Sequence, residues 1–302
     1  MLIIFEQVFI LFIFAAVGYA LCKCNMVNSG HSQILSKLLV YVFLPCNIFK
    51  TFAANFTHRY ISEKYEIVIS SLVLIIILAV VMHFVAKVFS EDKYERSIYE
   101  YSLVIPNYGY MGYALAEGLL GESGLMNLMI FALPVSCYTY MVGFSMLTKR
   151  SLSLKKLLNP AIIAMTVGMA AGIFEVTLPE IAVSILNKSS ACMAPVSMLL
   201  AGIVISEFDL KVLLYNKLTY IVVLLRLVLI PVVLGTVLHI ICTPETVQTS
   251  ILLYAMPCGL NTIVFPKMIE ENCKIGAGLA FISNVLACIT IPIIFTVFKI
   301  GG

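Results

Sequence analysis

The chain of 302 residues has a net charge of only +3, with 61% hydrophobic and 12% charged residues, and its mean hydropathy is +1.04. These values exclude a soluble globular domain, and the small net charge argues against a nucleic-acid partner. We therefore expect an all-α integral membrane protein whose surroundings are the lipid bilayer.

Apolar runs of about 20 residues, the length that a spanning helix needs, recur along the whole chain. The first run carries Glu6 and has no basic residues before it, so we interpret it as a span and not as a cleaved signal peptide. We predict ten transmembrane helices, at residues 2–22, 33–54, 66–88, 97–119, 124–147, 159–176, 180–206, 217–241, 247–269 and 275–298.

Lysine and arginine residues in the connections predict the orientation, because positively charged loops stay in the cytoplasm. The odd-numbered connections carry most of them, including the central segment 149–158, whereas the even-numbered connections and the two ends hold only Arg59, Lys64 and Lys299. The sequence thus predicts a multi-pass protein of the cell membrane, with both termini outside and a cytoplasmic linker at 149–158.

The proline positions of the first half recur in the second half. Pro195 lies 150 residues after Pro45, and Pro257 lies 151 residues after Pro106. We interpret this as an internal repeat of five helices, 1–148 and 159–302, joined by the linker at 149–158. Because five is odd, the second repeat enters the membrane from the opposite side. Inverted repeats with discontinuous helices are typical of secondary transporters whose site lies near the bilayer midplane.

Proline, glycine and asparagine interrupt the fourth and the ninth predicted spans. If these broken helices cross, two half-helix N-termini face the centre and favour an anion. The asparagines either orient this anion or only cap the opened backbone. The predicted substrate-binding residues are Pro106, Asn107, Tyr108, Gly109, Pro257, Gly259 and Asn261. Further structural breaks are expected at Pro45, Gly112 and Pro195.

The order and spacing of several short motifs resemble the auxin efflux carrier family. The motifs are Val17-Gly18-Tyr19, Val42-Phe43-Leu44-Pro45, Pro106-Asn107-Tyr108-Gly109-Tyr110-Met111-Gly112, Ala194-Pro195 and Ala255-Met256-Pro257 through Asn261. The resemblance covers essentially the whole chain. It is closer to the prokaryotic branch, whose members are often described as malonate or malate permeases, than to the plant auxin exporters, whose central cytoplasmic loop is much longer.

This resemblance implies the fold of sodium/bile acid symporters and sodium/proton antiporters, with crossed broken helices 4 and 9. It implies a scaffold of spans 1, 2, 6 and 7 and a mobile transport domain of spans 3–5 and 8–10. In the plant carriers, the crossing prolines and adjacent asparagines bind the substrate carboxylate. The matching positions in this chain are Pro106 with Asn107 and Pro257 with Asn261.

Arg226 lies nine residues into the eighth predicted span, where an arginine costs at least ~2.5 kcal/mol unless it snorkels or pairs. We interpret it either as a snorkelling or ion-paired residue, or as a residue behind the substrate site. No acidic residue closely flanks either break, which argues against proton antiport. Coupling to sodium stays open, because carbonyls, hydroxyls and amides alone can bind this ion.

We therefore expect a permease or efflux carrier that moves a small organic anion, in particular a carboxylate, by alternating access. The alternatives are a sodium-coupled symporter of the same architecture, a polytopic membrane enzyme or a channel. The chain contains no H-E-x-x-H or G-x-S-x-G motif, and its four histidines and nine cysteines are dispersed. We thus expect no catalytic site, no metal site and no cofactor. The small-residue spacing of Gly168 and Gly172 serves packing within the chain or a homodimer.

Overall fold

The computed structural model describes residues 2–28, 30, 32–149 and 160–300. Within these ranges the chain forms helices and no named strand. Each of the ten segments predicted to span the membrane is helical for most of its length. The predicted linker at 149–158 lies outside the described residues, apart from Lys149.

The helices of the first half begin with a long N-terminal helix and end before the undescribed segment. They are α1 (Leu2–Lys23), α2 (Ser32–Leu38), η2 (Leu39–Phe43), α3 (Leu44–Asn55), α4 (His58–Glu63), α5 (Tyr65–Phe89), α6 (Lys93–Val104), η3 (Tyr108–Gly112), α7 (Tyr113–Tyr138), η4 (Thr139–Gly143) and α8 (Phe144–Thr148). Gly121, with a φ of 67°, kinks α7 and divides it into two helical stretches. Only glycine adopts this backbone conformation readily.

The helices of the second half follow the undescribed segment. They are α9 (Pro160–Ile173), α10 (Glu180–Ala191), α11 (Met193–Ser206), α12 (Leu210–Leu214), α13 (Lys217–Leu224), η6 (Leu225–Leu229), α14 (Ile230–Ile241), α15 (Pro244–Tyr254), α16 (Asn261–Met268) and α17 (Lys274–Val297).

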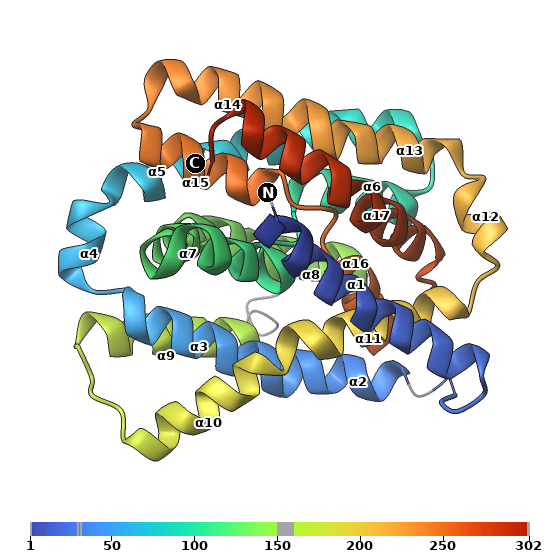
Figure 1. Cartoon of the computed structure of the whole chain (residues 1–302), viewed down its shortest axis with the longest axis horizontal. Coiled ribbons are helices and arrows are strands. Elements are labelled where there is room, and N and C mark those ends of the chain that lie inside the picture. Colours follow the sequence, from blue (N-terminus) through green and yellow to red (C-terminus); the bar gives the residue numbers. More distant parts are fainter. Residues whose placement is uncertain (1, 29, 31, 150–159, 301–302) are drawn as a thin grey trace.

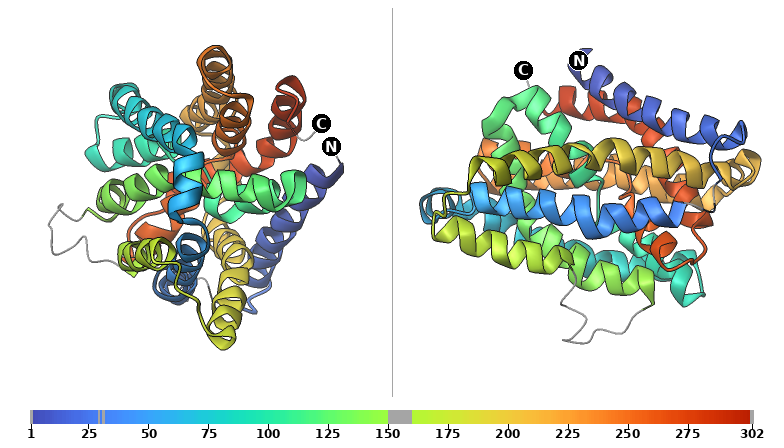
Figure 2. Two further views of the ribbon diagram at one scale, coloured as in Figure 1. Left: turned by 90° about the vertical axis from the view of Figure 1, so that its left-hand side faces the viewer. Right: turned by 90° about the horizontal axis from the view of Figure 1, so that it is seen from below.

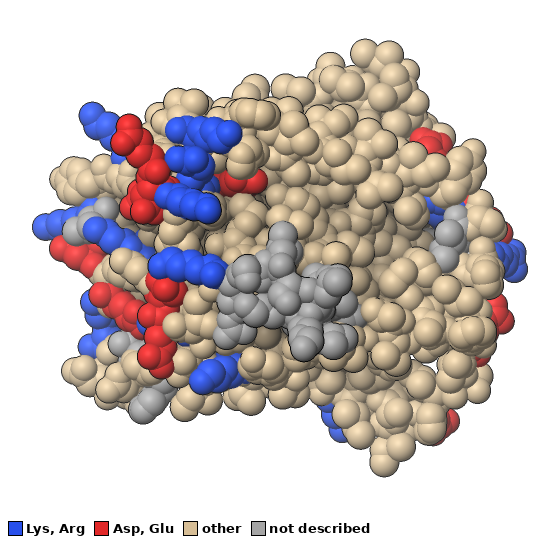
Figure 3. Space-filling model, turned by 180° about the vertical axis from the view of Figure 1, so that it is seen from behind, with Lys and Arg blue, Asp and Glu red and all other residues tan. Residues whose placement is uncertain are grey.

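Six continuous helical segments of the described chain are long and apolar enough to cross a membrane, namely Ser32–Asn55, Tyr65–Phe89, Ser123–Thr148, Glu180–Ser206, Lys217–Ile241 and Lys274–Val297. The long helices run roughly side by side along the longest axis (Figure 2). Charged side chains gather at the two ends of the face in Figure 3, and a wide belt of uncharged residues separates them. An uncharged belt between two charged ends is the pattern of a protein embedded in a bilayer. The prediction of a multi-pass, all-helical membrane protein is therefore confirmed.

The expected breaks at Pro45 and Pro195 are bends rather than interruptions. The helix from α2 to α3 continues through Pro45, with the wide turn of η2 directly before it. Pro195 lies in the first turn of α11, which follows α10 after a single residue. The first turn of a helix tolerates proline because its N–H groups have no intrahelical acceptor. Gly112 is also helical, with a φ of −62°, so the break precedes it.

The helices form two groups of neighbours (Figure 1). The first, here called the α3 group, contains α1, α2, α3, α9, α10 and α11. The second, here called the α5 group, contains α5–α8 and α13–α17. Extensive contacts join α1 to α11 and α3 to α9 within the α3 group, and α5 to α6 and α7 within the α5 group.

Glycines bring the helices of the α3 group very close together. A Cβ atom on Gly202 would lie 1.9 Å from a backbone oxygen of α1, and one on Gly18 would lie 2.2 Å from a backbone oxygen of α11. Gly168 and Gly172 likewise face the backbone of α3 and of the residue that follows it. The small-residue spacing of Gly168 and Gly172 thus serves helix packing within the chain.

Candidate functional site

Two unwound segments of the α5 group meet and cross. One joins α6 to η3 at residues 105–107, and the other joins α15 to α16 at residues 255–260. The backbone N–H of Asn107 donates to the carbonyl of Pro257 at 2.8 Å, and that of Gly259 donates to the carbonyl of Ile105 at 3.2 Å. These bonds form an isolated antiparallel bridge between Pro106 and Cys258. The two breaks predicted from proline, glycine and asparagine therefore meet and satisfy part of each other's backbone.

Two helices begin at this crossing, η3 with its continuation α7, and α16. The first N–H groups of a helix have no acceptor inside that helix, and the N-terminus carries a partial positive charge of roughly +0.5. Among the hydrogen bonds of the described residues, none uses the N–H of Leu260, directly before α16. The crossing thus offers backbone donors and positive dipole ends from two helices.

The two predicted asparagines differ in their surroundings. Asn107 is 1% exposed, and neither its Oδ1 nor its Nδ2 has a hydrogen-bond partner in the described part of the chain. Asn107 also makes no side-chain bond that caps η3. Asn261 is buried as well, but its Nδ2 donates to the hydroxyl of Tyr101 at 2.9 Å. Because a buried amide without a partner is costly, the orphaned Asn107 side chain points to a ligand or water that it binds.

A small cavity lies against the crossing. All predicted substrate-binding residues except Pro257 line it, and Leu260, Leu44, Tyr140 and Met193 complete the wall. Its volume is about 20 Å³, which is room for about one water molecule. The cavity is therefore too small for a ligand larger than a water molecule.

Some of these lining residues had a signal in the sequence. Leu44 precedes Pro45, and Met193 lies two residues before Pro195, so both accompany the expected breaks. They bring the bends of α2–α3 and of α10–α11 to the cavity wall. Tyr140 in η4 had no such signal, because nothing near it in the sequence interrupts its helix.

Arg226 does not snorkel, and among the described residues it forms no ion pair. Its side chain is 0% exposed. Its Nε donates to the carbonyl of Met256 at 3.3 Å, and its Nη1 donates to the carbonyl of Leu103 at 3.0 Å. The guanidinium carbon lies 5.6 Å from the ring centre of Tyr254. Arg226 thus lies at the crossing, but it does not line the cavity.

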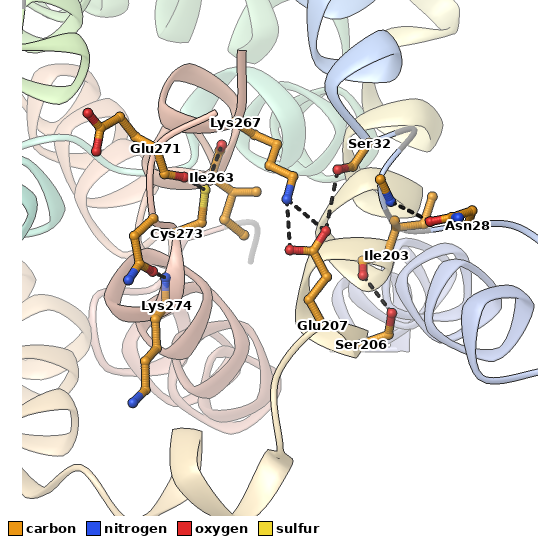
Figure 4. A network of polar contacts seen from close by, with 12 residues as sticks. Asn28, Ser32, Ile203, Ser206, Glu207, Ile263, Lys267, Glu271, Cys273 and Lys274 are labelled. Atoms are coloured by element: carbon orange, nitrogen blue, oxygen red, sulfur yellow. Dashed lines mark hydrogen bonds and ion pairs between the residues drawn. The ribbon is translucent and has the colours of Figure 1, made fainter. Parts of the chain in front are cut away.

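Polar contacts tie the two helix groups together at the end of the molecule where α12 lies (Figure 4). The Nζ of Lys267, in α16, lies 2.7 Å from both carboxylate oxygens of Glu207, which follows α11. The hydroxyl of Ser32 donates to the same carboxylate at 3.4 Å. Close by, the side chain of Gln33 donates to the carbonyl of Met268 at 3.3 Å. These contacts hold α16 against α2 and α11.

A second network lies near the start of α15. Lys64 contacts the carboxylate of Glu245 at 2.6 Å, and the side chain of Asn127 donates to the same oxygen at 2.7 Å. No group of three or more His, Cys, Asp or Glu side chains in the described ranges is placed to hold a metal ion.

Comparison with known proteins adds two findings. Residues 3–156 and 144–295 match a family described as "Membrane transport protein". The chain is also 22% identical, over 301 residues, to an uncharacterized transporter of Methanocaldococcus jannaschii. This alignment covers 95% of the present chain and 96% of the archaeal protein.

Proposed function

This chain belongs to the membrane transport protein family of auxin efflux carriers, and from this premise we propose that it is a secondary transporter for a small carboxylate. It is a membrane transporter and not an enzyme. The observation that carries the carboxylate proposal is the buried, unpartnered amide of Asn107 beside two helix N-termini. Backbone N–H groups at helix N-termini bind carboxylates without a charged side chain.

The proposed architecture is ten transmembrane helices in two inverted repeats, 1–148 and 159–302. It is supported by the matching order of elements, because each half has one helix bent at a proline (α2–α3 and α10–α11) and one broken helix at the crossing. In this proposal the α3 group is the scaffold and the α5 group is the transport domain. Their relative movement opens the cavity alternately to the two sides of the cell membrane.

The first test of this function is a stability screen. Purified protein is heated with a panel of monocarboxylates and dicarboxylates, with malonate and malate among the first, in sodium-containing and sodium-free buffer. A ligand that binds only the folded state raises the melting temperature. Each compound that stabilises the protein is then tested for uptake into proteoliposomes.

We expect selectivity for anions over amines. No aspartate or glutamate of the described chain lines the cavity, and the helix N-termini that face it repel cations. Carboxylates should therefore compete with one another for binding, whereas amines of matched size should not compete with carboxylates. Competition between a carboxylate and its amine counterpart at comparable concentrations would contradict an anion site.

We also expect the α12 end to be cytoplasmic. Much of the charge on the face shown in Figure 3 lies at that end, and so do Lys211 in α12 and Lys267 and Lys274, which belong to two of the basic odd-numbered connections. A reporter at Met1 or Gly302 should be accessible from outside, and one within 149–158 only from inside. Because the rule for positive loops sets this orientation, labelling of the central segment from outside intact cells would contradict it.

A further inference from the structure

The broken helices leave backbone carbonyls without their usual partners. In a continuous helix, the N–H of Asn107 would bond to the carbonyl of Leu103, but here it donates to Pro257. In the second break, the N–H of Leu260 makes no bond to the carbonyl of Met256 in the described structure. The C-terminal end of a helix also carries a partial negative charge of roughly −0.5. The ends of α6 and α15 therefore create a site that favours a cation.

Arg226 occupies this site. Its guanidinium donates to the carbonyls of Leu103 and Met256, one from each broken helix, and packs over the ring of Tyr254. It comes from η6, a stretch with a wide helical turn in the middle of a long apolar segment. Such turns are frequent at functional sites. With no carboxylate paired to it in the described ranges, its charge faces only carbonyls and helix ends, and its Nη2 has no hydrogen-bond partner among the described residues.

In secondary transporters with broken helices, unwound carbonyls and half-helix C-termini commonly coordinate the coupling sodium ion. We propose that Arg226 is a tethered cation that takes the place of such an ion, so that this carrier moves its anion without sodium. This inference rests on the proposed transport function. The guanidinium also adds positive charge at the crossing. The N-terminal ends of η3 and α16 at the same crossing face the cavity. The guanidinium therefore favours the bound anion throughout the cycle.

The test compares the wild type with Arg226→Ala in proteoliposomes, with malonate as the first probe. Wild-type uptake should be the same in sodium, potassium and choline buffers. In sodium-free buffer, the uptake rate of Arg226→Ala should be about tenfold or more lower than that of the wild type, because the charged hydrogen bonds to both carbonyls are lost. Added sodium or guanidinium ions should restore much of this uptake, because they can enter the vacated carbonyl site.

Arg96→Ala is the matched control. Arg96 also donates to two backbone carbonyls, those of Ser90 at 3.3 Å and Glu91 at 3.1 Å, but it lies at the start of α6, away from the crossing. Its removal should introduce no sodium dependence. If Arg226→Ala does not fold, Arg226→Gln replaces it, because glutamine keeps a donor for one carbonyl.

A second measurement does not depend on the substrate. Sodium chloride, compared with choline chloride, should raise the melting temperature of Arg226→Ala but not that of the wild type. This readout distinguishes the two proposals, because it reports on the cation site even if no carboxylate is transported. The tethered-cation proposal is overturned if wild-type uptake requires sodium. It is also overturned if the folded variant transports normally without sodium, or if neither sodium nor guanidinium rescues or stabilises it.

Discussion

Asn107→Ala is expected to lose transport while the protein stays folded. The Asn107 side chain makes no hydrogen bond within the described structure, so its removal breaks none. The loss of one contact to the substrate in a closed site costs roughly 1 to 3 kcal/mol, or about fivefold to more than a hundredfold in affinity. We expect the melting temperature without ligand to stay the same or rise, because an unsatisfied buried amide is removed. Uptake kinetics and ligand-free thermal stability are the two measurements.

Asn261→Ala should lose transport as well, but with a different effect on stability. Its Nδ2 donates to the hydroxyl of Tyr101, so the variant also loses an internal bond. Side-chain hydrogen bonds inside membranes average only about 0.6 kcal/mol. We therefore expect a small fall in melting temperature, which Tyr101→Phe should share without an equal loss of uptake.

Two further variants sharpen this result. Asn107→Asp keeps the shape of the side chain and adds a negative charge, so it should bind carboxylates even less well than Asn107→Ala. Asn55→Ala is the control, because Asn55 is an amide in a membrane helix that bonds to the carbonyl of Thr51, at the end of α3. If both crossing variants transport like the wild type, the asparagines do not bind the substrate.

The crossing could be predicted because its cause is local. Pro106 and Pro257 lack an N–H and each lies close to glycine and asparagine within an apolar run, so an opened backbone is favoured at both places. The lengths of the apolar runs also predicted the helices closely, since bilayer thickness sets the length of a spanning helix. The segments 180–206 and 217–241 agree with the structure at both ends.

The remaining features depend on contacts between distant residues. Pro45 and Pro106 look alike in the sequence, but a wide turn carries the helix through Pro45. The partners of Arg226 could not be predicted, because Leu103 lies 123 residues away and offers only a carbonyl. Tyr140 reaches the cavity through helix packing alone. Such partners follow from the tertiary structure, which no local pattern encodes.

Reversing one charge of the Lys267–Glu207 pair is expected to impair transport strongly. Lys267 lies in α16, which begins at the crossing, and Glu207 lies directly after α11 in the other helix group. If the α5 group moves to open the cavity at the α12 end, this pair must break. The contact therefore stabilises the state that is closed at that end. The side chains are 18% and 21% exposed, so we expect an energy between those of surface and buried pairs, about 1 to 3 kcal/mol.

Lys267→Glu places two carboxylates where an ion pair was, and Glu207→Lys places two ammonium groups there. Both shift the population towards the state open at the α12 end, and each should reduce the uptake rate by about tenfold. The double variant with exchanged charges restores the attraction and should regain most of the rate. A double-mutant cycle of initial uptake rates measures this coupling.

Lys149→Glu is the matched control for this last prediction. Lys149 pairs with Glu271 at 2.8 Å, but it follows α8 while Glu271 lies between α16 and α17, so both residues belong to the α5 group. The same change of charge there breaks a contact within the proposed transport domain. Because both residues move together, uptake should change little. If Lys149→Glu is as defective as Lys267→Glu, a general charge effect explains both. If the double exchange is no better than its single variants, the pair does not hold this end closed.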